Sequence, residues 1–348
     1  MIDVRAPVEY EHGAFPSAVN LPLLSDSERH EVGIKFKNAG QDSAIELANE
    51  LVSGSSRLER LNNWQKYLEN NPSAVVYCFR GGLRSQTVQR WMNDRDLDVT
   101  LVEGGYKALR RFLITTTETV SVKSKFMIIG GKTGSAKTHL INALDFSIDL
   151  EGLANHRGSA FGRRIDQQPS QIDFENRLGI ALLKLPYQKP EHIFLEDESR
   201  SIGSLAIPKV FHDKMADSPI AMLEETLEGR VETIYKDYIY SNLQDYKEQD
   251  ANAASDNFSE FLLGSLQRIQ RRLGAEKYGQ IRTMMEQALN HNDPEESGSL
   301  HRQWIRSLLC DYYDPMYDYQ MNKKLNRVIY RGSREEFSAW ASHLNRLP

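Results

Sequence analysis

The segment VVYCFRGGLRSQTVQ (residues 75–89) has the order that decides the fold: an apolar run, a loop with two glycines and two arginines, and a stretch of helical composition. A short apolar run bounded by turn residues predicts a buried strand. A strand that leads directly into a helix is typical of parallel α/β layer folds. The single cysteine of this segment, Cys78, lies where the strand is expected to end.

The position of Cys78 favours a reactive thiol. Backbone N–H groups of a strand-to-helix turn point inward, and the helix adds its positive end. Both effects lower the pKa of a thiol below its free value of about 8.5, and the thiolate is the nucleophile. Arg80 and Arg84 can bind a phosphate-like or sulfate-like anion, and Gly81 and Gly82 permit positive φ angles. We therefore take Cys78, Arg80 and Arg84 as candidate catalytic residues; the alternative is a buried cysteine at a strand end.

Two chemistries fit this loop. In the first, Cys78 carries sulfur or selenium as a persulfide or perselenide. In the second it hydrolyses phosphate esters, because Cys78 and Arg84 stand in Cys-x5-Arg spacing. Phosphatases of that kind often have a histidine just before the cysteine, whereas Tyr77 precedes it here. This difference favours sulfur or selenium transfer without excluding hydrolysis.

The alternation of strands and helices continues around this segment. Strands are expected at 2–4, 74–78 and 98–105, and helices at 43–69, 85–94 and 106–113. The Thr/Ser-rich stretch TTTETVSVKSK (115–125) is expected to be a linker, with an edge strand as the alternative. A first domain of residues 1–114 follows from these patterns.

Two motifs of this domain resemble the rhodanese family. IDVRAPVEYEHGAFPSAVNLP (2–22) is similar to its entry segment, and CFRGGLRS (78–85) to its active loop. Rhodanese domains usually have a strand before the segment at 2–4. We therefore expect either that this domain lacks that strand or that the sequence is shortened.

A second glycine-rich loop, GKTGSAKT (131–138), lies between an apolar segment and a helical one, which is the context of a phosphate-binding loop. Its backbone N–H groups would surround a diphosphate, its lysine would neutralise the charge, and its threonine would hold a metal such as Mg²⁺. Alanine replaces the second glycine of G-x-x-x-x-G-K-[ST], which is tolerable if its φ is negative. The alternative is a glycine-rich turn with a surface lysine. The candidate phosphate-binding residues are Gly131, Lys132, Thr133, Gly134, Ser135, Ala136, Lys137 and Thr138.

The rest of the chain, residues 126–348, predicts a P-loop NTPase-like α/β domain with a largely helical C-terminal region. A strand is expected at 192–197, helices dominate about 210–320, and NRVIYRG (326–332) is strand-like. That late strand is expected to return to the sheet that holds residues 126–129. Ser333 and Glu336 have the spacing of a helix capping box.

Several polar residues of this domain are candidates for substrate binding. Asp197 follows an apolar strand and is a candidate to position metal or water, in competition with Glu196 and Glu198. His156 and Arg157 are candidates for contact with a phosphate or a base; a capping loop is the alternative. Arg200 would reach a phosphate or form a structural ion pair. The tyrosines of YYDPMYDYQ (312–320) would stack on bases, line an apolar pocket or belong to the core.

With these motifs, nearly the whole chain resembles the tRNA 2-selenouridine synthase family, in which a rhodanese-type domain is fused to a P-loop domain. The segments that carry the resemblance, besides the two loops, are LVEGGYKALRR (101–111), GLANHRGSAFG (152–162), FLEDESRSIG (194–203) and YYDPMYDYQ (312–320). The resemblance implies a tRNA-modifying transferase that acts on wobble 2-thiouridine. Geranyl diphosphate first alkylates the sulfur, and selenium from selenophosphate then displaces the S-geranyl group.

The resemblance also implies the partners and cofactors. The expected partners are tRNAs for Lys, Glu and Gln with 2-thiouridine at the wobble position, and an enzyme that supplies selenophosphate. No tightly bound cofactor is expected, with Mg²⁺ at Thr138 as a candidate metal. We assign geranyl diphosphate to the loop at 131–138 and selenophosphate to the Cys78 loop, and the reverse assignment stays open.

Contact with tRNA requires local basic patches, because the net charge of the 348-residue chain is −5. Arginines on one helix face predict a stripe that binds backbone phosphates, although such a run is usually a solvated surface. The candidate tRNA-binding residues are Arg268, Arg271 and Arg272 in the helical region, and Lys107, Arg110 and Arg111 after EGGY.

The whole-chain composition favours a cytoplasmic enzyme. The two cysteines, Cys78 and Cys310, do not form a disulfide framework, which indicates a reducing compartment. The longest apolar runs are too short to span a bilayer, and the N-terminus lacks the apolar core of a signal peptide. The main rival function is a sulfurtransferase with a regulatory nucleotide-binding domain and no RNA substrate.

Overall fold

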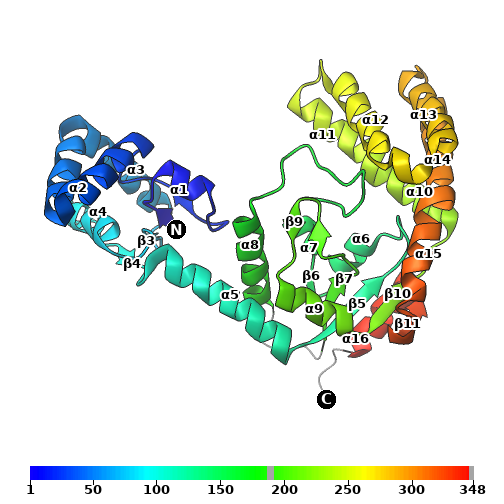
Figure 1. Ribbon diagram of the computed structural model, residues 1–348, viewed down its shortest axis with the longest axis horizontal. Coiled ribbons are helices and arrows are strands. Elements are labelled where there is room, and N and C mark those ends of the chain that lie inside the picture. Colours follow the sequence, from blue (N-terminus) through cyan, green and yellow to red (C-terminus); the bar gives the residue numbers. More distant parts are fainter. Residues whose placement is uncertain (186–191, 345–348) are drawn as a thin grey trace. The chain divides into compact units, whose positions relative to one another are not determined.

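The computed structural model describes residues 1–185 and 192–344, which form two compact units. The N-terminal unit contains residues 1–117 together with 170–180. The C-terminal unit contains 118–169 and the chain from 181 onward. Helices α5 (Gly105–Lys123) and α8 (Gln171–Lys184) each have residues in both units (Figure 1).

The N-terminal unit is built on a four-stranded parallel sheet in the order β2-β1-β3-β4. Its strands are β1 (Ile2–Asp3), β2 (Val19–Asn20), β3 (Val75–Tyr77) and β4 (Thr100–Leu101). The apolar side chains of β1 and β3 are buried in the core of the unit together with those of the flanking helices. The strands predicted at 2–4, 74–78 and 98–105 are confirmed, although each is shorter than expected.

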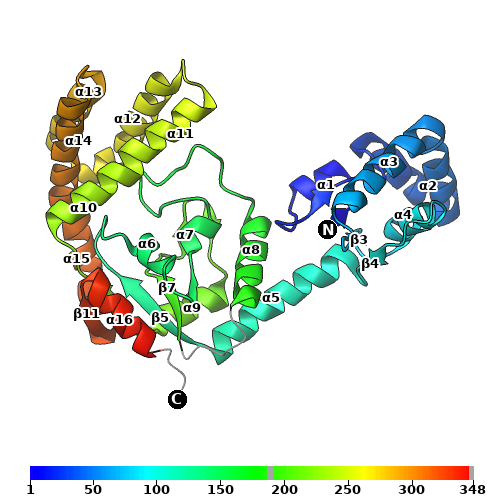
Figure 2. The same cartoon turned by 180° about the vertical axis from the view of Figure 1, so that it is seen from behind.

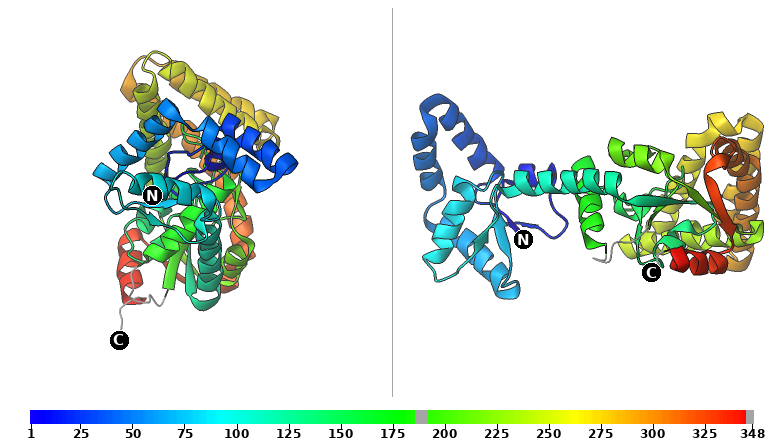
Figure 3. Two further views of the ribbon diagram at one scale, coloured as in Figure 1. Left: turned by 90° about the vertical axis from the view of Figure 1, so that its left-hand side faces the viewer. Right: turned by 90° about the horizontal axis from the view of Figure 1, so that it is seen from below.

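The helices of this unit are α1 (Pro7–Glu11), α2 (Asp26–Leu51), α3 (Gly54–Asn70), α4 (Leu83–Asn93) and α5. The single helix predicted at 43–69 is therefore two helices. The first begins much earlier, where Ser25 and Glu28 form a capping box. Helix α2 bends at Gly40, whose φ of 83° is a left-handed value that suits glycine (Figure 3).

The boundary between the two units falls inside the predicted linker 115–125, but this segment is not irregular: helix α5 continues to Lys123 and strand β5 begins at Lys125. The hydroxyls of Thr116 and Thr117 donate hydrogen bonds to the carbonyls four residues earlier, at 2.9 and 3.1 Å, so these polar side chains are satisfied within the helix. Thr117 is also buried. This tertiary burial outweighs the weak helix propensity of threonine.

Residues 170–180 are part of the N-terminal unit although they follow the phosphate-loop region in sequence. Asp173 accepts a hydrogen bond from the Ala14 N–H at 2.7 Å, and Asn176 donates one to the Ala14 carbonyl at 2.8 Å. Arg110 forms an ion pair with Glu175. Residues 170–180 thus provide hydrogen-bond partners for the N–H and the carbonyl of Ala14 and a carboxylate for Arg110.

The C-terminal unit is built on a five-stranded parallel sheet in the order β11-β10-β5-β7-β6. Its strands are β5 (Lys125–Gly130), β6 (Ser147–Ile148), β7 (His192–Glu196), β10 (Ile220–Leu223) and β11 (Val328–Gly332). The late strand returns to the sheet that contains β5, as predicted. Strand β10 lies between them and was missed, because its four apolar residues stand inside a stretch expected to be helical.

Short helices pack around this sheet, and longer ones are inserted in sequence between β10 and β11. The elements near the sheet are α6 (Lys137–Ile141), α7 (Leu150–Leu153), the hairpin β8–β9 (Ser201–Ile202, Leu205–Ala206), α9 (Lys209–Asp217) and α16 (Arg334–Leu344). The predicted capping box of α16 is present, since the Ser333 N–H donates to Glu336 at 2.8 Å. Both units thus confirm the predicted fold class.

A helical region with its own apolar core covers most of residues 227–322 (Figure 2). Its helices are α10 (Leu227–Ile234), α11 (Ser241–Gln249), α12 (Ala254–Leu273), α13 (Ala275–Asn290), α14 (Pro294–Leu308) and α15 (Asp314–Asn322). Two π-helical turns, at 235–240 and 309–313, connect α10 to α11 and α14 to α15. Within the described ranges, we find no helix whose length and apolar character would let it cross a bilayer.

A buried ion pair gives a stability prediction for the N-terminal unit. Asp3 and Arg5 are 0 and 2 % exposed, and the Arg5 guanidinium donates to Asp3 at 2.6 Å and to the Gly13 carbonyl at 2.9 Å. Asp3→Ala leaves the Arg5 charge buried without its partner, so we expect a loss of about 3–5 kcal/mol in urea unfolding. Asp94→Ala is the control, since Asp94 is an exposed partner of Arg57 and should cost less than about 1 kcal/mol. Equal losses in the two variants would contradict the prediction.

Candidate active site

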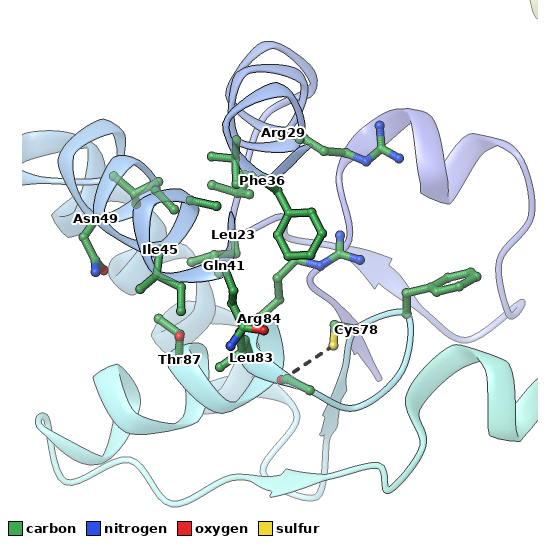
Figure 4. A pocket seen from close by; sticks show the side chains of 18 of the residues that line it. Leu23, Arg29, Phe36, Gln41, Ile45, Asn49, Cys78, Leu83, Arg84 and Thr87 are labelled. Carbon is green, nitrogen blue, oxygen red and sulfur yellow. Dashed lines mark hydrogen bonds between the residues drawn. The ribbon is translucent and has the colours of Figure 1, made fainter. Parts of the chain in front are cut away.

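Cys78 lies at the carboxyl end of β3, five residues before α4 begins. It is 3 % exposed, and its Sγ lies 3.2 Å from the Ser85 hydroxyl and 3.8 Å from the Gly82 carbonyl (Figure 4). Gly81 has a φ of 66°, and a Cβ there would come within 2.8 Å of the Gly104 nitrogen. The loop therefore closes around the sulfur only with glycine at this position.

The surroundings of Cys78 favour the thiolate. Burial raises the pKa of the thiol, but the Ser85 hydroxyl, the N–H groups of Ser85 and Arg80, and the charge of Arg84 outweigh it. The pKa of Cys78 is consequently lowered, as the sequence predicted. Ser85 was not identified from the sequence, although its place in the first turn of the following helix was the available signal.

The two arginines of the loop differ in their surroundings. Arg84 forms an ion pair with Glu9 through contacts of 2.5 and 3.2 Å. Arg29 also lies 3.2 Å from Glu9. Arg80 is exposed, and its guanidinium lies 6.0 Å from the centre of the Phe79 ring. An anion bound at this loop would therefore replace Glu9 as the partner of Arg84.

The second loop, residues 131–138, joins β5 to α6, and its lysine forms a hydrogen bond with the backbone of the same loop. Lys137 Nζ donates to the Gly131 carbonyl at 2.8 Å, and the Gly131 N–H donates to the Tyr317 hydroxyl at 2.7 Å. The Ser135 hydroxyl is buried and has no hydrogen-bond partner in the described part of the chain. A free donor and a lysine close to a ring of backbone groups suit an oxyanion of the diphosphate type.

The condition for an unstrained alanine at position 136, a negative φ, is not met, because Ala136 has a φ of 59° and a ψ of 39°. This left-handed conformation costs an alanine roughly 1–2 kcal/mol. The loop thus keeps the backbone path of the G-x-x-x-x-G-K-[ST] motif. Contacts of the surrounding structure hold Ala136 in this strained conformation, which glycine would adopt without strain.

Of the acidic residues at the end of β7, Glu196 and not Asp197 forms a hydrogen bond with the loop. The Thr138 hydroxyl donates to Glu196 and to Glu151, both at 3.2 Å. Burial and the nearby Glu151 raise the pKa of Glu196 to about 8. Asp197 instead forms an ion pair with Lys324 at 2.8 Å.

Side chains of the helical region contact the loop of residues 131–138. Arg230 binds Asp314 through two contacts of 2.7 Å and reaches the Thr133 carbonyl at 3.3 Å. Lys132 lies 3.0 Å from Asp318. Tyr317 comes from the same segment, so YYDPMYDYQ supports the loop directly. Arg230 was missed because nothing near it in sequence links it to the loop.

The candidate substrate-binding residues after the loop have mainly structural contacts. His156 is 6 % exposed and accepts a hydrogen bond from the Gly158 N–H at 3.1 Å. Arg157 donates to the Asp237 carbonyl and to Asn242 at 2.5 and 2.9 Å. Arg200 is exposed just before β8. The capping-loop alternative therefore describes Arg157 better than substrate contact does.

The predicted basic patches are only partly available to a ligand. Arg110 is held by Glu175 and Asn176, and Arg268 donates to the Ala160 carbonyl at 2.8 Å. Helix α12, which contains Arg268, Arg271 and Arg272, ends at Leu273 and is followed by Gly274 with a φ of 87°. Lys107, Arg111, Arg271 and Arg272 are exposed, and so is Arg268 apart from its hydrogen bonds to the protein.

These two sites define a class of protein: a rhodanese-like unit with an activated thiol, joined to a P-loop unit. Family models agree, since a rhodanese-like domain matches residues 1–111 and a tRNA 2-selenouridine synthase AAA domain matches 124–346. Described residues contain no group of three or more His, Cys, Asp or Glu side chains placed to hold a metal ion.

Whole-chain relatives identify the family. A tRNA 2-selenouridine synthase of Marinobacter nauticus is 48 % identical over 98 % of this chain and 93 % of its own length. Those of Alcanivorax borkumensis and Pseudomonas aeruginosa are each 47 % identical, over 98 and 97 % of this chain and 94 and 92 % of their own. The chain belongs to the tRNA 2-selenouridine synthase family.

The Cys78 environment gives a prediction on pH dependence. Ser85→Ala removes a hydrogen bond to the thiolate, so the pKa of Cys78 should rise. In a Cys310→Ser background, which removes the exposed second cysteine, the pH at half-maximal alkylation by iodoacetamide should move upward. Ser27→Ala, on α2 of the same unit, serves as the control. An unchanged midpoint in the Ser85 variant would show that this hydroxyl does not stabilise the thiolate.

The strained loop residue gives a prediction on stability. Ala136→Gly relieves the left-handed strain of about 1–2 kcal/mol, while the unfolded chain gains entropy worth about 0.4–1 kcal/mol. We expect a net gain of up to about 1 kcal/mol in urea unfolding. Ala143→Gly in the same region, where φ is not positive, should lose stability instead. The prediction fails if both substitutions have the same sign.

Proposed function

We propose that this protein converts wobble 2-thiouridine of tRNA to 2-selenouridine by geranylation with geranyl diphosphate and then selenation with selenophosphate. The observation that carries the proposal is the presence, in one chain, of a buried thiol with a lowered pKa and a loop suited to a diphosphate. The relatives named tRNA 2-selenouridine synthase, which align over nearly their full length, support the same conclusion.

The first step would take place at the loop of residues 131–138. The 2-thiouridine sulfur forms a bond to the first carbon of the geranyl group, and diphosphate leaves with the electrons of the broken C–O bond. Lys137, once it exchanges the Gly131 carbonyl for the substrate, and the loop N–H groups would stabilise this developing charge. Thr138 and Glu196 offer the oxygen ligands that Mg²⁺ prefers, and a bound ion would add further charge neutralisation.

The second step would take place at Cys78. An alkylated sulfur is a better leaving group than a thiocarbonyl, so selenium can replace it at C2 of the base. The Cys78 thiolate would attack C2 of the alkylated base and release geranyl thiolate, and selenium would then displace Cys78 from C2 as its bond to phosphorus breaks and the phosphoryl group passes to water. Arg80 and Arg84 would hold the phosphate end of selenophosphate. Substrate tRNAs for Lys, Glu and Gln and a selenophosphate-supplying enzyme complete the proposal. The exposed Lys107, Arg111, Arg268, Arg271 and Arg272 would contact the tRNA backbone.

The test is mass spectrometry of tRNA nucleosides after incubation with thiolated tRNA, geranyl diphosphate and selenophosphate, each omitted in turn. Lys137→Ala should abolish S-geranyl-2-thiouridine, because the diphosphate loses its counter-charge. Cys78→Ser should still form that intermediate but no 2-selenouridine. Cys310→Ser, which alters the other cysteine, should retain both products.

Three outcomes would count against the proposal. Normal geranylation by Lys137→Ala would overturn the assignment of geranyl diphosphate to this loop. Failure to shift tRNA in a low-salt gel would favour a sulfurtransferase with a regulatory nucleotide-binding unit. Release of phosphate from aryl phosphates would favour a Cys-x5-Arg phosphatase.

A further inference from the structure

A large apolar cavity opens beside Cys78 in the N-terminal unit (Figure 4). Its volume is about 820 Å³, within the range of about 300–1,000 Å³ typical of small-molecule sites. The bend of α2 at Gly40 lets both arms of this helix contribute to the walls. The apolar side chains that line it include Leu23, Val32, Phe36, Ala44, Ile45 and Ala48.

The lining of this cavity combines two kinds of chemistry. Cys78, Arg80 and Arg84 are among the lining residues, so a nucleophilic sulfur and two guanidinium groups border a mainly apolar space. Phe36 and Leu83 are 54 and 51 % exposed, which is a large apolar area to leave in water. A ligand that fits both has a hydrocarbon chain and a polar, reacting head.

The cavity beside the loop of the C-terminal unit has a volume of about 410 Å³, but its lining is largely polar and includes the charged side chains of Lys132, Glu224 and Arg230. The apolar cavity next to Thr133, between Phe161 and Trp304, has a volume of only about 30 Å³. A ten-carbon chain does not fit there without rearrangement of the surrounding core. The N-terminal cavity is therefore the larger and more apolar space, which suits an isoprenoid chain.

We propose that this cavity binds the geranyl chain of S-geranyl-2-thiouridine, the intermediate of the proposed function, on which this inference rests. The chain fills the apolar space, and C2 of the base lies at Cys78. Selenium reaches C2 from selenophosphate, whose P–Se bond breaks as the phosphoryl group passes to water. When the C–S bond to the geranyl-bearing sulfur breaks, that sulfur leaves as geranyl thiolate with the bonding electrons. Its hydrocarbon part is already out of water. Unalkylated 2-thiouridine lacks the group that fills the cavity, so selenation follows geranylation.

The test uses the full chain with tRNA that has already been geranylated, so that the first step is not needed. Ala48→Phe places a ring in the cavity and should lower kcat/KM for selenation at least tenfold, mainly through KM. Ala39→Phe is the matched control, because Ala39 lies on the same helix, is exposed and is not among the cavity-lining residues. Phe36→Ser is a second variant at an exposed position, so that its folding is not at risk, and it should also raise KM.

A direct binding measurement accompanies the kinetics. S-geranyl-2-thiouridine nucleoside should change the tryptophan fluorescence of the wild type, since Trp91 lines the cavity, and 2-thiouridine should not. The change should be lost in Ala48→Phe and kept in Ala39→Phe. Wild-type affinity in Ala48→Phe would overturn the proposal. The proposal would also be overturned if the wild type does not bind the nucleoside but self-associates, and Ala48→Phe abolishes this self-association. That result would assign the cavity to a protein partner.

The binding arm separates this inference from the proposed function. If the wild type binds the geranylated nucleoside through the cavity but never geranylates tRNA, the function proposed for the second loop fails and the cavity assignment stands. If geranylation and selenation both occur and the cavity variants behave as wild type, the proposed function stands and the assignment of the cavity to the geranyl chain fails.

Discussion

Both candidate sites depend on one constraint of parallel sheets: the carboxyl end of a strand leads into the amino end of a helix. The first N–H groups of that helix have no partner within it and carry partial positive charge. In the N-terminal unit this junction follows β3 and stabilises a thiolate. In the C-terminal unit it follows β5 and surrounds a space suited to phosphate oxygens. Two different sites thus use the same backbone electrostatics.

The charged groups of both sites already have internal partners. Glu9 pairs with Arg84, and the Gly131 carbonyl accepts a hydrogen bond from Lys137. Thr138 is bound by two glutamates, of which Glu196 has a raised pKa. A buried charge without a partner is costly, so these contacts stabilise the fold when no ligand is bound. They also favour ligands that offer a stronger or better placed anion than the internal one.

The sequence predicted what is encoded locally. Strands, glycine-rich loops, Cys78 and Lys137 were found because each motif is continuous in the chain. Glu9 and Arg230 were missed because they reach the loops from distant segments, and one sequence has no signal for such contacts. Burial of Thr117 made a helix of the presumed linker. The left-handed Ala136 could not be anticipated, since surrounding contacts, rather than its own preference, impose that conformation.

The placement of residues 170–180 in the N-terminal unit has a consequence for how the gene can be divided. A fragment that stops near residue 117 would lack Asp173 and Asn176, and the backbone of Ala14 would lose both of its partners. Arg110 would also lose its carboxylate. The N-terminal unit therefore cannot be exchanged as one continuous segment. Recombination near residue 117 would yield an N-terminal unit that lacks residues 170–180.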